Sequence, residues 1–310
     1  MRAAQDRAAD HGLPEGISAK HGLAGLVERG AATLFFTLFP SDCRICGSPL
    51  RTISQLPVCQ ECLVALHPLQ GSYCAVCGEV LHLSSDNHQD AEGGETRCML
   101  CQRADPPYER AVAYGSYDGQ LRDLIHLLKF RMVAPAAAVL GGKLAGTIAS
   151  LECKMPVGKI AVVAVPLYSR KRRQRGFNQA EMIAREAVRQ LGRPKRYEFC
   201  GGILRRCRET RSQIGLTSHQ RRENMRGAFA VSEPTRIAKR DILLIDDVLT
   251  TGTTASECAR VLLRAGAARV WVATVARMLK MKTSDLMVLP TSDDLTEEGI
   301  GEHQRLAAHG

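Results

Sequence analysis

Long apolar runs and aromatic side chains are both scarce in this chain of 310 residues. The best apolar stretch, residues 31–39, falls far short of the ~20 residues that a membrane-spanning helix needs. No small-residue cleavage site follows it, which argues against a secretory signal. We therefore expect a cytoplasmic protein that does not insert into membranes. Aromatic residues form only 5% of the chain, so bases would find few side chains on which to stack.

Acidic residues are also in the minority, because 42 lysines and arginines face 32 aspartates and glutamates. The net charge of +10 understates the imbalance, since residues 281–310 are themselves acidic and the rest of the chain is more basic still. A surface of this kind attracts polyanions such as pyrophosphate, nucleotides or nucleic acid.

Cysteine is abundant by contrast, and eight of the twelve cysteines form four Cys-x-x-Cys pairs. Without export they sit in a reducing compartment, where this spacing indicates metal binding rather than disulfides. Two such pairs complete the tetrahedral thiolate shell of a structural zinc, which leaves no position for a catalytic water. The pairs are Cys43 and Cys46, Cys59 and Cys62, Cys74 and Cys77, and Cys98 and Cys101.

The order of the pairs along the chain favours one zinc held by the first two pairs and another held by the last two. A cross-braced pairing or a single merged site is the alternative, so we expect one or two structural zinc ions. The remaining cysteines lack partners at metal spacing and are expected to act as small apolar residues. They are Cys153, Cys200, Cys207 and Cys258.

The most informative stretch lies at residues 242–254. Branched apolar residues at 242–245 predict a buried strand of a parallel sheet, and an amphipathic pattern from Ala255 predicts a helix. The polar residues between them lie where a helix N-terminus meets the carboxyl edge of a sheet, which is where α/β folds bind ligands. These residues are Asp246 and Asp247, followed by Thr250, Thr251, Gly252, Thr253 and Thr254.

The backbone N–H groups and threonine hydroxyls of this loop can surround one phosphate, and Gly252 allows a close approach. Asp246 and Asp247 only accept hydrogen bonds when ionised, so they suit the hydroxyls of a sugar. The stretch resembles the phosphoribosyl-pyrophosphate (PRPP) motif of type I phosphoribosyltransferases. The resemblance implies a loop that holds the 5′-phosphate and a catalytic acidic pair that holds the ribose 2′ and 3′ hydroxyls. An ordinary strand–turn–helix is the alternative.

A second polar loop, residues 167–177, follows a predicted strand at 160–165 and precedes a predicted helix at 180–191. It carries five cations, and at the carboxyl edge of the sheet these would suit a pyrophosphate that carries Mg²⁺. A solvated run of charge is the alternative interpretation. The residues expected to contact the pyrophosphate are Arg175, Asn178 and Gln179.

A third polar segment, residues 206–224, lacks a sustained apolar period and is too long for an ordinary connection. It forms either a functional loop or an unstructured segment. Its arginine, threonine and glutamine pattern resembles the flexible loop of amido-type phosphoribosyltransferases. This implies that Arg211 serves the pyrophosphate or a loop that closes over the site and excludes water.

Predicted strands alternate with predicted helices throughout the second half of the chain, which indicates a doubly wound parallel α/β sheet. Its strands are expected at 111–117, 160–165, 242–245 and 269–276. Its first helix is expected at 120–130.

Four segments follow from these patterns. Residues 1–40 are expected to be a disordered start and an amphipathic helix, and residues 41–105 a double zinc ribbon. Residues 106–280 are expected to form the phosphoribosyltransferase-like domain, and residues 281–310 a disordered acidic tail.

Four sequence blocks resemble the ComF family, whose members combine an N-terminal zinc ribbon with a phosphoribosyltransferase-like fold. The blocks are residues 128–131, 165–167, 175–180 and 222–229, which lie in the family's order together with the cysteine pairs and the Asp-Asp loop. Met132 departs from the pattern, because the family usually has glycine after Lys-Phe-Arg.

We predict that the protein binds PRPP–Mg²⁺ and transfers the phosphoribosyl group to an unidentified acceptor, largely by positioning and electrostatics. The alternative is a competence factor for DNA uptake that binds single-stranded DNA and keeps the fold and the PRPP site without a transferase role. The partners expected from the resemblance are PRPP, single-stranded DNA, and competence or helicase proteins.

Overall fold

The computed structural model describes residues 41–51, 54–81, 96–103, 105–210 and 217–279. The helix expected before residue 40 and the acidic tail expected after residue 280 lie outside these ranges. Within them, no helix combines the length and the apolar character needed to cross a bilayer.

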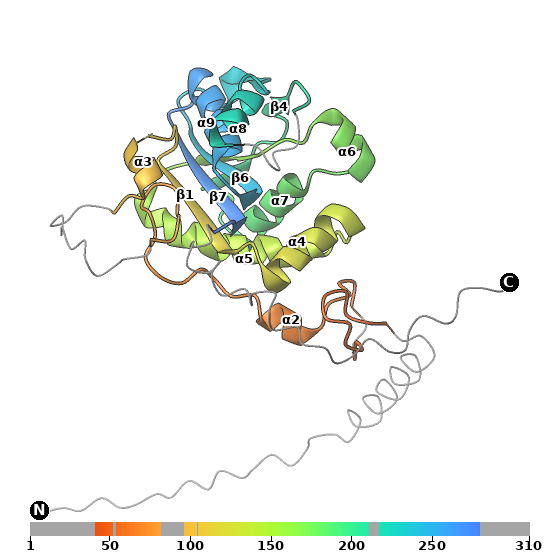
Figure 1. The fold of residues 1–310 in the computed structure, drawn as a ribbon. Coiled ribbons are helices and arrows are strands. Elements are labelled where there is room, and N and C mark those ends of the chain that lie inside the picture. Colours follow the sequence, from red (N-terminus) through yellow and green to blue (C-terminus); the bar gives the residue numbers. More distant parts are fainter. Residues whose placement is uncertain (1–40, 52–53, 82–95, 104, 211–216, 280–310) are drawn as a thin grey trace, which may run out of the picture.

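A five-stranded sheet forms the centre of the molecule, with strand order β1-β7-β6-β2-β3 and every neighbouring pair parallel (Figure 1). The strands form where branched apolar residues run together, as predicted. One prediction is wrong in extent, because the strand expected to end at residue 245 continues to Leu249 and contains both aspartates. The strands are β1 (Arg110–Ser116), β2 (Ile160–Ala164), β3 (Tyr197–Phe199), β6 (Asp241–Leu249) and β7 (Arg269–Arg277).

Helices cover both faces of this sheet, which confirms the doubly wound α/β fold. One face carries α4 (Gly119–Arg131), α5 (Ala136–Leu151) and α7 (Gln179–Leu191), whose apolar residues share one core cluster with Leu243 and Ile245 of β6. The other face carries α9 (Thr253–Arg264) in a second cluster with Ile242 and Leu244. Two 3₁₀ turns complete the connections, at Glu152–Lys154 and Pro234–Arg236.

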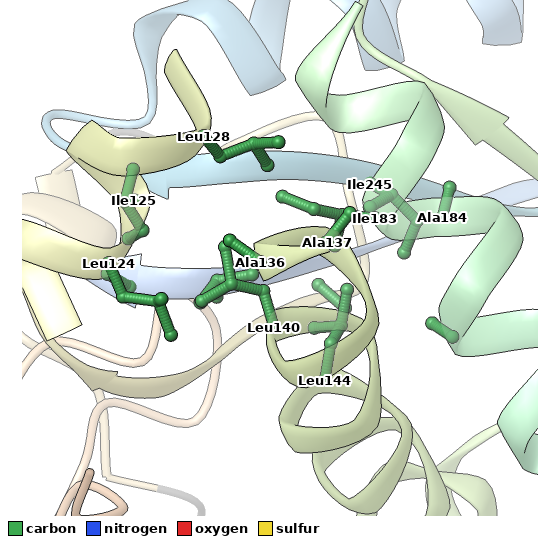
Figure 2. Packing of buried hydrophobic residues seen from close by; sticks show 14 of the residues in the cluster. Leu124, Ile125, Leu128, Ala136, Ala137, Leu140, Leu144, Ile183, Ala184 and Ile245 are labelled. Carbon is green, nitrogen blue, oxygen red and sulfur yellow. The ribbon is translucent and has the colours of Figure 1, made fainter. Parts of the chain in front are cut away.

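Figure 2 shows how α4, α5 and α7 meet over β6, with Leu124, Leu140 and Ile183 among the side chains that converge. Helix α5 packs directly against α7 at Gly141, which has no side chain. A Cβ atom at Gly141 would stand 2.5 Å from the Cβ of Glu186.

The two ends of the polar segment at 206–224 form regular structure. Its start belongs to strand β4 (Leu204–Arg206), which forms an antiparallel hairpin with β5 (Phe229–Val231). Its end is helix α8 (Ser218–Met225), which begins with a reciprocal capping box between Thr217 and Gln220. Arg211, assigned to this segment, lies outside the described residues.

The basic loop predicted at 167–177 is instead the short helix α6 (Ser169–Arg175), which stands out from the sheet in Figure 1. It ends at Gly176, whose φ of 76° is a left-handed conformation that suits glycine. The cations are therefore carried by a short helix that follows β2 in the chain.

The cysteine-rich half packs on the sheet as two turns, each followed by a helix of five residues, α2 (Gln60–Val64) and α3 (Met99–Arg103). The second turn lies along β1, an edge strand of the sheet. There the N–H of Ala111 donates to the carbonyl of Val76 at 2.7 Å, and the N–H of Leu69 donates to the carbonyl of Tyr114 at 2.7 Å.

Met132 ends helix α4 in the left-handed region, with φ 54° and 61% of its surface exposed. A residue with a Cβ atom is strained in this backbone conformation. Because the Met132 side chain is mostly exposed, replacing it by glycine loses few packing contacts. Met132→Gly should therefore raise the free energy of unfolding by about 1 kcal/mol, after the greater freedom of glycine in the unfolded chain is deducted. Urea unfolding of the two proteins measures the difference, and a destabilised glycine variant would contradict the strain.

Candidate functional site

The candidate site lies where the helical connections switch from one face of the sheet to the other. From β2 the chain runs through α7 to β3, whereas from β6 it runs through α9 on the other face to β7. The two strands are neighbours, and the N–H of Val165 donates to the carbonyl of Ile245 at 2.9 Å. The segments that follow them therefore diverge and leave a crevice at the carboxyl edge, the usual ligand position in open α/β sheets.

Asp246 and Asp247 occupy successive positions of β6, so their side chains leave opposite faces of the sheet. Asp247 is 5% exposed and faces α4, where its Oδ2 atom lies 3.0 Å from the Nζ atom of Lys129. Asp246 is half-buried on the α9 side, and its Oδ1 atom accepts a hydrogen bond from the Asp247 N–H at 2.9 Å. The two carboxylates therefore lie on opposite faces of the sheet and do not form one cluster.

The surroundings of Asp246 and Lys129 shift the pKa values of both groups upward. Burial, followed by the charge of Asp247, raises the pKa of Asp246 to about 8. Burial would lower the pKa of Lys129, but the attraction of Asp247 outweighs it and the pKa of Lys129 lies above its ordinary value. Lys129 therefore stays cationic beside Asp247, while the raised pKa of Asp246 favours its protonated form near neutral pH.

The threonine loop begins directly after Leu249. Gly252 caps the N-terminus of α9 with φ 75°, and the hydroxyls of Thr251 and Thr253 lie 2.8 Å apart. A Cβ atom on Gly252 would stand 3.2 Å from the hydroxyl of Tyr108, so this position has little room for a side chain. Hydroxyls and unpaired N–H groups at a helix N-terminus form a site suited to a phosphate.

The cationic side of the crevice is organised around Arg175. Its guanidinium lies 5.1 Å from the ring centre of Phe130, and its Nη1 atom donates to Gln179 Oε1 at 3.2 Å. Asn178 serves the backbone with both polar atoms, since its amide donates to the Val165 carbonyl and its oxygen accepts from the Ala180 N–H. Asn178 thus fixes the start of α7 against the end of β2.

The C-terminal turn of α4 links these parts and supplies two residues to which the sequence assigned no role. Lys129 contacts the carboxylate side through Asp247, and Phe130 contacts the cationic side through Arg175. In the sequence, residues 128–131 were noted only because they resemble a block of the ComF family, and no function was predicted for them. A third residue, Arg206 of β4, lies on the Asp246 side, and its buried Nε atom has no hydrogen-bond partner within the described residues.

The first four predicted zinc ligands meet in the sequential pairing, with all four sulfurs within 4.8 Å of one another. The Sγ atoms of Cys46 and Cys59 are 3.5 Å apart, and those of Cys43 and Cys62 are 3.9 Å apart. A tetrahedron with Zn–S bonds of ~2.3 Å has edges of ~3.8 Å, so the group fits zinc. Hydrogen bonding with Ser48 lowers the pKa of Cys46 to about 6, which favours the thiolate.

The second group fits the same geometry. The sulfurs of Cys74, Cys77, Cys98 and Cys101 also lie within 4.8 Å of one another, with Cys77 and Cys98 separated by 3.6 Å. All four are buried, whereas Cys46 of the first group is exposed. Both groups consist of four sulfurs, so a zinc bound there would be structural.

Solved structures that resemble the fold include two hypoxanthine-type phosphoribosyltransferases. Hypoxanthine phosphoribosyltransferase from Staphylococcus aureus covers 47% of this chain and 70% of its own length, with 12% identity and a TM-score of 0.29. Hypoxanthine-guanine phosphoribosyltransferase from Schistosoma mansoni covers 48% and 61%, with 14% identity and a TM-score of 0.27. Scores this low carry no argument of their own, and the fold class rests on the sheet and its helices.

Sequence relatives extend over most of the chain, although no family model matches it. The DNA utilization protein YhgH of Salmonella typhi is 31% identical over 242 residues, which cover 77% of this chain and 98% of the relative. Competence protein F of Haemophilus influenzae is 27% identical over 231 residues, covering 71% and 96%. Competence protein ComFC of Bacillus subtilis is 25% identical over 214 residues, covering 68% and 80%. The resemblance seen in the sequence blocks is confirmed, and the chain belongs to the ComF family.

Proposed function

We propose that the protein binds PRPP–Mg²⁺ in the crevice between β2 and β6 and transfers its phosphoribosyl group to an acceptor. The observation that carries the proposal is the convergence of three parts at one sheet edge. These are the acidic positions of β6, the threonine loop before α9 and the cationic helix α6 after β2.

Each part matches one portion of the substrate. The threonine loop suits the 5′-phosphate, because helix N–H groups and hydroxyls donate to phosphate oxygens. Asp246 and Asp247 suit the ribose hydroxyls, and the Nζ atom of Lys129 lies 3.0 Å from Asp247 Oδ2 in its buried position. The pyrophosphate then falls toward Arg175, and a bound Mg²⁺ would neutralise part of its charge.

The transfer needs little chemistry from side chains. A lone pair of the acceptor forms a bond to C1 of the ribose as the C1–O bond to pyrophosphate breaks. The electron pair of that bond leaves with the pyrophosphate, and a proton of the acceptor, where there is one, passes to solvent. The protein contributes positioning and charge.

A second candidate function, binding of single-stranded DNA, is favoured by the surface of α6. Its four most exposed cations have no acidic partner within the described residues, and Phe130 nearby is 61% exposed. Cations for the backbone and an aromatic ring for a base are the elements of single-strand binding. The names of the relatives, which refer to DNA utilization and competence, agree with this candidate.

Arg175 separates the two functions. If it contacts pyrophosphate, Arg175→Ala should weaken PRPP binding about 10–100-fold and change ribose 5-phosphate binding little, because only PRPP carries the lost partner. Calorimetric titration with both ligands measures the difference. Arg172→Ala, an exposed cation on the same helix, is the matched control. Equal losses of affinity for PRPP and for ribose 5-phosphate would show that α6 does not contact the pyrophosphate.

Competition supplies the second half of the experiment. If α6 also contacts a DNA backbone, each lost arginine should lower single-stranded DNA affinity for all sequences and reduce the slope of log affinity against log salt by about one unit. Millimolar PRPP should then displace the DNA. Independent binding of the two ligands would place the DNA elsewhere on the molecule.

A further inference from the structure

Two contacts hold the threonine loop from the side of the second cysteine group, which consists of Cys74, Cys77, Cys98 and Cys101. A helix N-terminus binds phosphate more tightly when its N–H groups already point at the ligand before it arrives. Residues that keep the loop in shape can therefore change phosphate affinity without touching the phosphate.

The first contact fixes the backbone just before the loop. Leu249, the last residue of β6, pairs with Arg277 at the end of β7, and the N–H of Met278 donates to the Leu249 carbonyl at 2.9 Å. The Arg277 guanidinium donates from Nη1 to the Cys77 carbonyl and from Nη2 to Glu79 Oε2, both at 2.6 Å. Arg277 is 4% exposed, and charge-assisted hydrogen bonds of this kind are among the strong ones. The position of Leu249 is thereby tied to the turn that carries Cys77.

The second contact reaches the middle of the loop through Tyr108. This ring is 7% exposed and belongs to the core cluster that contains all four cysteines of the second group together with Leu249 and Ala255. Its hydroxyl lies at Gly252, since a Cβ atom on that glycine would come within 3.2 Å of it. Gly252 is the N-cap of α9, and its carbonyl accepts from the Ser256 N–H at 2.8 Å. Tyr108 therefore packs with the cysteine group and also lies against the N-terminal turn of α9.

The first cysteine group is placed differently. Its buried members Cys43, Cys59 and Cys62 share a core cluster with α4 and α5. Among the described residues, that cluster includes none from the threonine loop and none from α9. Loss of metal from the two groups should therefore affect different parts of the molecule.

We infer that the second cysteine group, with its metal bound, positions the threonine loop, and that Tyr108 and Arg277 are the positioning residues. Metal bound there would make the turn at Cys77 rigid, and the two contacts would pass this restraint to Leu249 and Gly252. Neither positioning residue needs to touch the phosphate. The consequence for phosphate affinity rests on the proposed function, whereas the restraint on the loop does not.

Hydrogen exchange of the free protein tests the restraint without a ligand. Tyr108→Phe removes only the hydroxyl at Gly252, so the amides in the first turn of α9, residues 256–258, should exchange about 3–10-fold faster. The amides of α7 at residues 182–184 should stay within about twofold of the native rate. The matched control is Tyr73→Phe, because the Tyr73 hydroxyl is buried without a hydrogen-bond partner among the described residues. Unchanged exchange at 256–258, or equal acceleration in both variants, would overturn the inference.

Variants of the two cysteine groups test the part played by the metal. Cys98→Ser takes one sulfur from the second group and should accelerate exchange at 256–258 more than Tyr108→Phe does. Cys46→Ser takes one sulfur from the first group and should accelerate α4 instead, with residues 256–258 within about twofold of the native rate. An equal or larger effect of Cys46→Ser on α9 would overturn the link to the second group.

Ligand titration shows whether the restraint reaches the phosphate. PRPP and ribose 5-phosphate both carry the 5′-phosphate, so Tyr108→Phe should weaken both by the same factor, about 3–10-fold. Arg277→Lys keeps the charge beside Glu79 and loses the forked geometry, so it should also weaken both ligands equally. Arg175→Ala, by contrast, is expected to weaken PRPP alone. A loss confined to PRPP in the Tyr108 variant, or unchanged affinity for both ligands, would overturn the positioning role.

The proposed function and this inference fail separately. If the native protein binds neither PRPP nor ribose 5-phosphate, the proposed function is wrong, and exchange at residues 256–258 still decides whether the cysteine group restrains the loop. If PRPP binds but neither exchange nor affinity responds to Tyr108→Phe, the proposed function stands and the inference is wrong.

Discussion

Above pH 8, where Asp246 is ionised, Asp246→Asn should weaken PRPP binding about 10–100-fold, because a charge-assisted hydrogen bond to a ribose hydroxyl is worth roughly 1.5–3 kcal/mol. The substitution keeps the shape of a half-buried side chain and removes only its charge. Calorimetric titration with PRPP–Mg²⁺ measures the loss. An unchanged PRPP affinity would show that Asp246 does not contact the ribose.

The pH dependence provides a second test of Asp246. Its pKa in the folded protein is raised to about 8 from the ordinary 3.8, so the folded protein holds a proton that the unfolded chain has released over that interval. The contribution of Asp246 to stability therefore falls as pH rises toward 8. The asparagine variant should lack this decline and unfold at a higher temperature than the native protein above pH 8. Its PRPP affinity should also lack the rise toward pH 8 expected of the native carboxylate.

Asp247 needs a different design because of Lys129. Removing one partner of a buried ion pair leaves the other charge uncompensated, at a cost of about 3–5 kcal/mol. Asp247→Asn should therefore lower stability as well as PRPP affinity. Adding Lys129→Met should restore much of the stability and none of the affinity. Recovery of affinity in the double variant would show that the single variant failed by unfolding.

The protein should contain about two zinc ions per chain, and their removal should have the largest effect on stability. Structural zinc in small sites contributes roughly 10–16 kcal/mol of apparent binding free energy. The sequence alone predicts that chelation melts only the cysteine-rich half. The structure changes this expectation, because Cys62 belongs to the core cluster of α4 and α5, and Cys77 to that of α9. Chelation should therefore lower the unfolding temperature of the whole molecule.

Elemental analysis of protein purified without chelator tests the metal count. Cys98→Ser should lose one zinc and destabilise the α9 side, whereas Cys153→Ser, at an exposed cysteine outside both groups, should lose none. One zinc per native chain would indicate that only one group is loaded, and no zinc would exclude the zinc-ribbon interpretation.

Much of this architecture could be predicted from the sequence because its signals are local. The two-residue spacing of the cysteines indicated metal sites, and the order of the pairs favoured the sequential grouping that the sulfurs adopt. Runs of branched apolar residues located β2, β6 and β7. Helix α5 could not be found in this way. Its small residues, such as Gly141, blur the helical period, yet they are the residues that let it approach α7.

The site was predictable only where its residues are close in sequence. The aspartates and the threonine loop form one continuous segment, whereas Lys129 meets Asp247 across more than a hundred residues of chain. Nothing in the sequence near Lys129 indicates that contact. The opposite orientation of the two aspartates could not be predicted, because the strand was expected to end before them. In the structure it continues to Leu249, so successive side chains point to opposite faces.

The attachment of the second cysteine group to β1 has a consequence for solubility. β1 is an edge strand, and an uncovered edge presents free N–H and carbonyl groups on which another chain can add a strand. The bonds from Ala111 to Val76 and from Leu69 to Tyr114 occupy part of that edge. Gly78 also lies close against it, since a Cβ atom there would stand 2.8 Å from the Ala111 carbonyl. Metal starvation would thus uncover a template for aggregation, and the zinc site would protect newly made chains from one another.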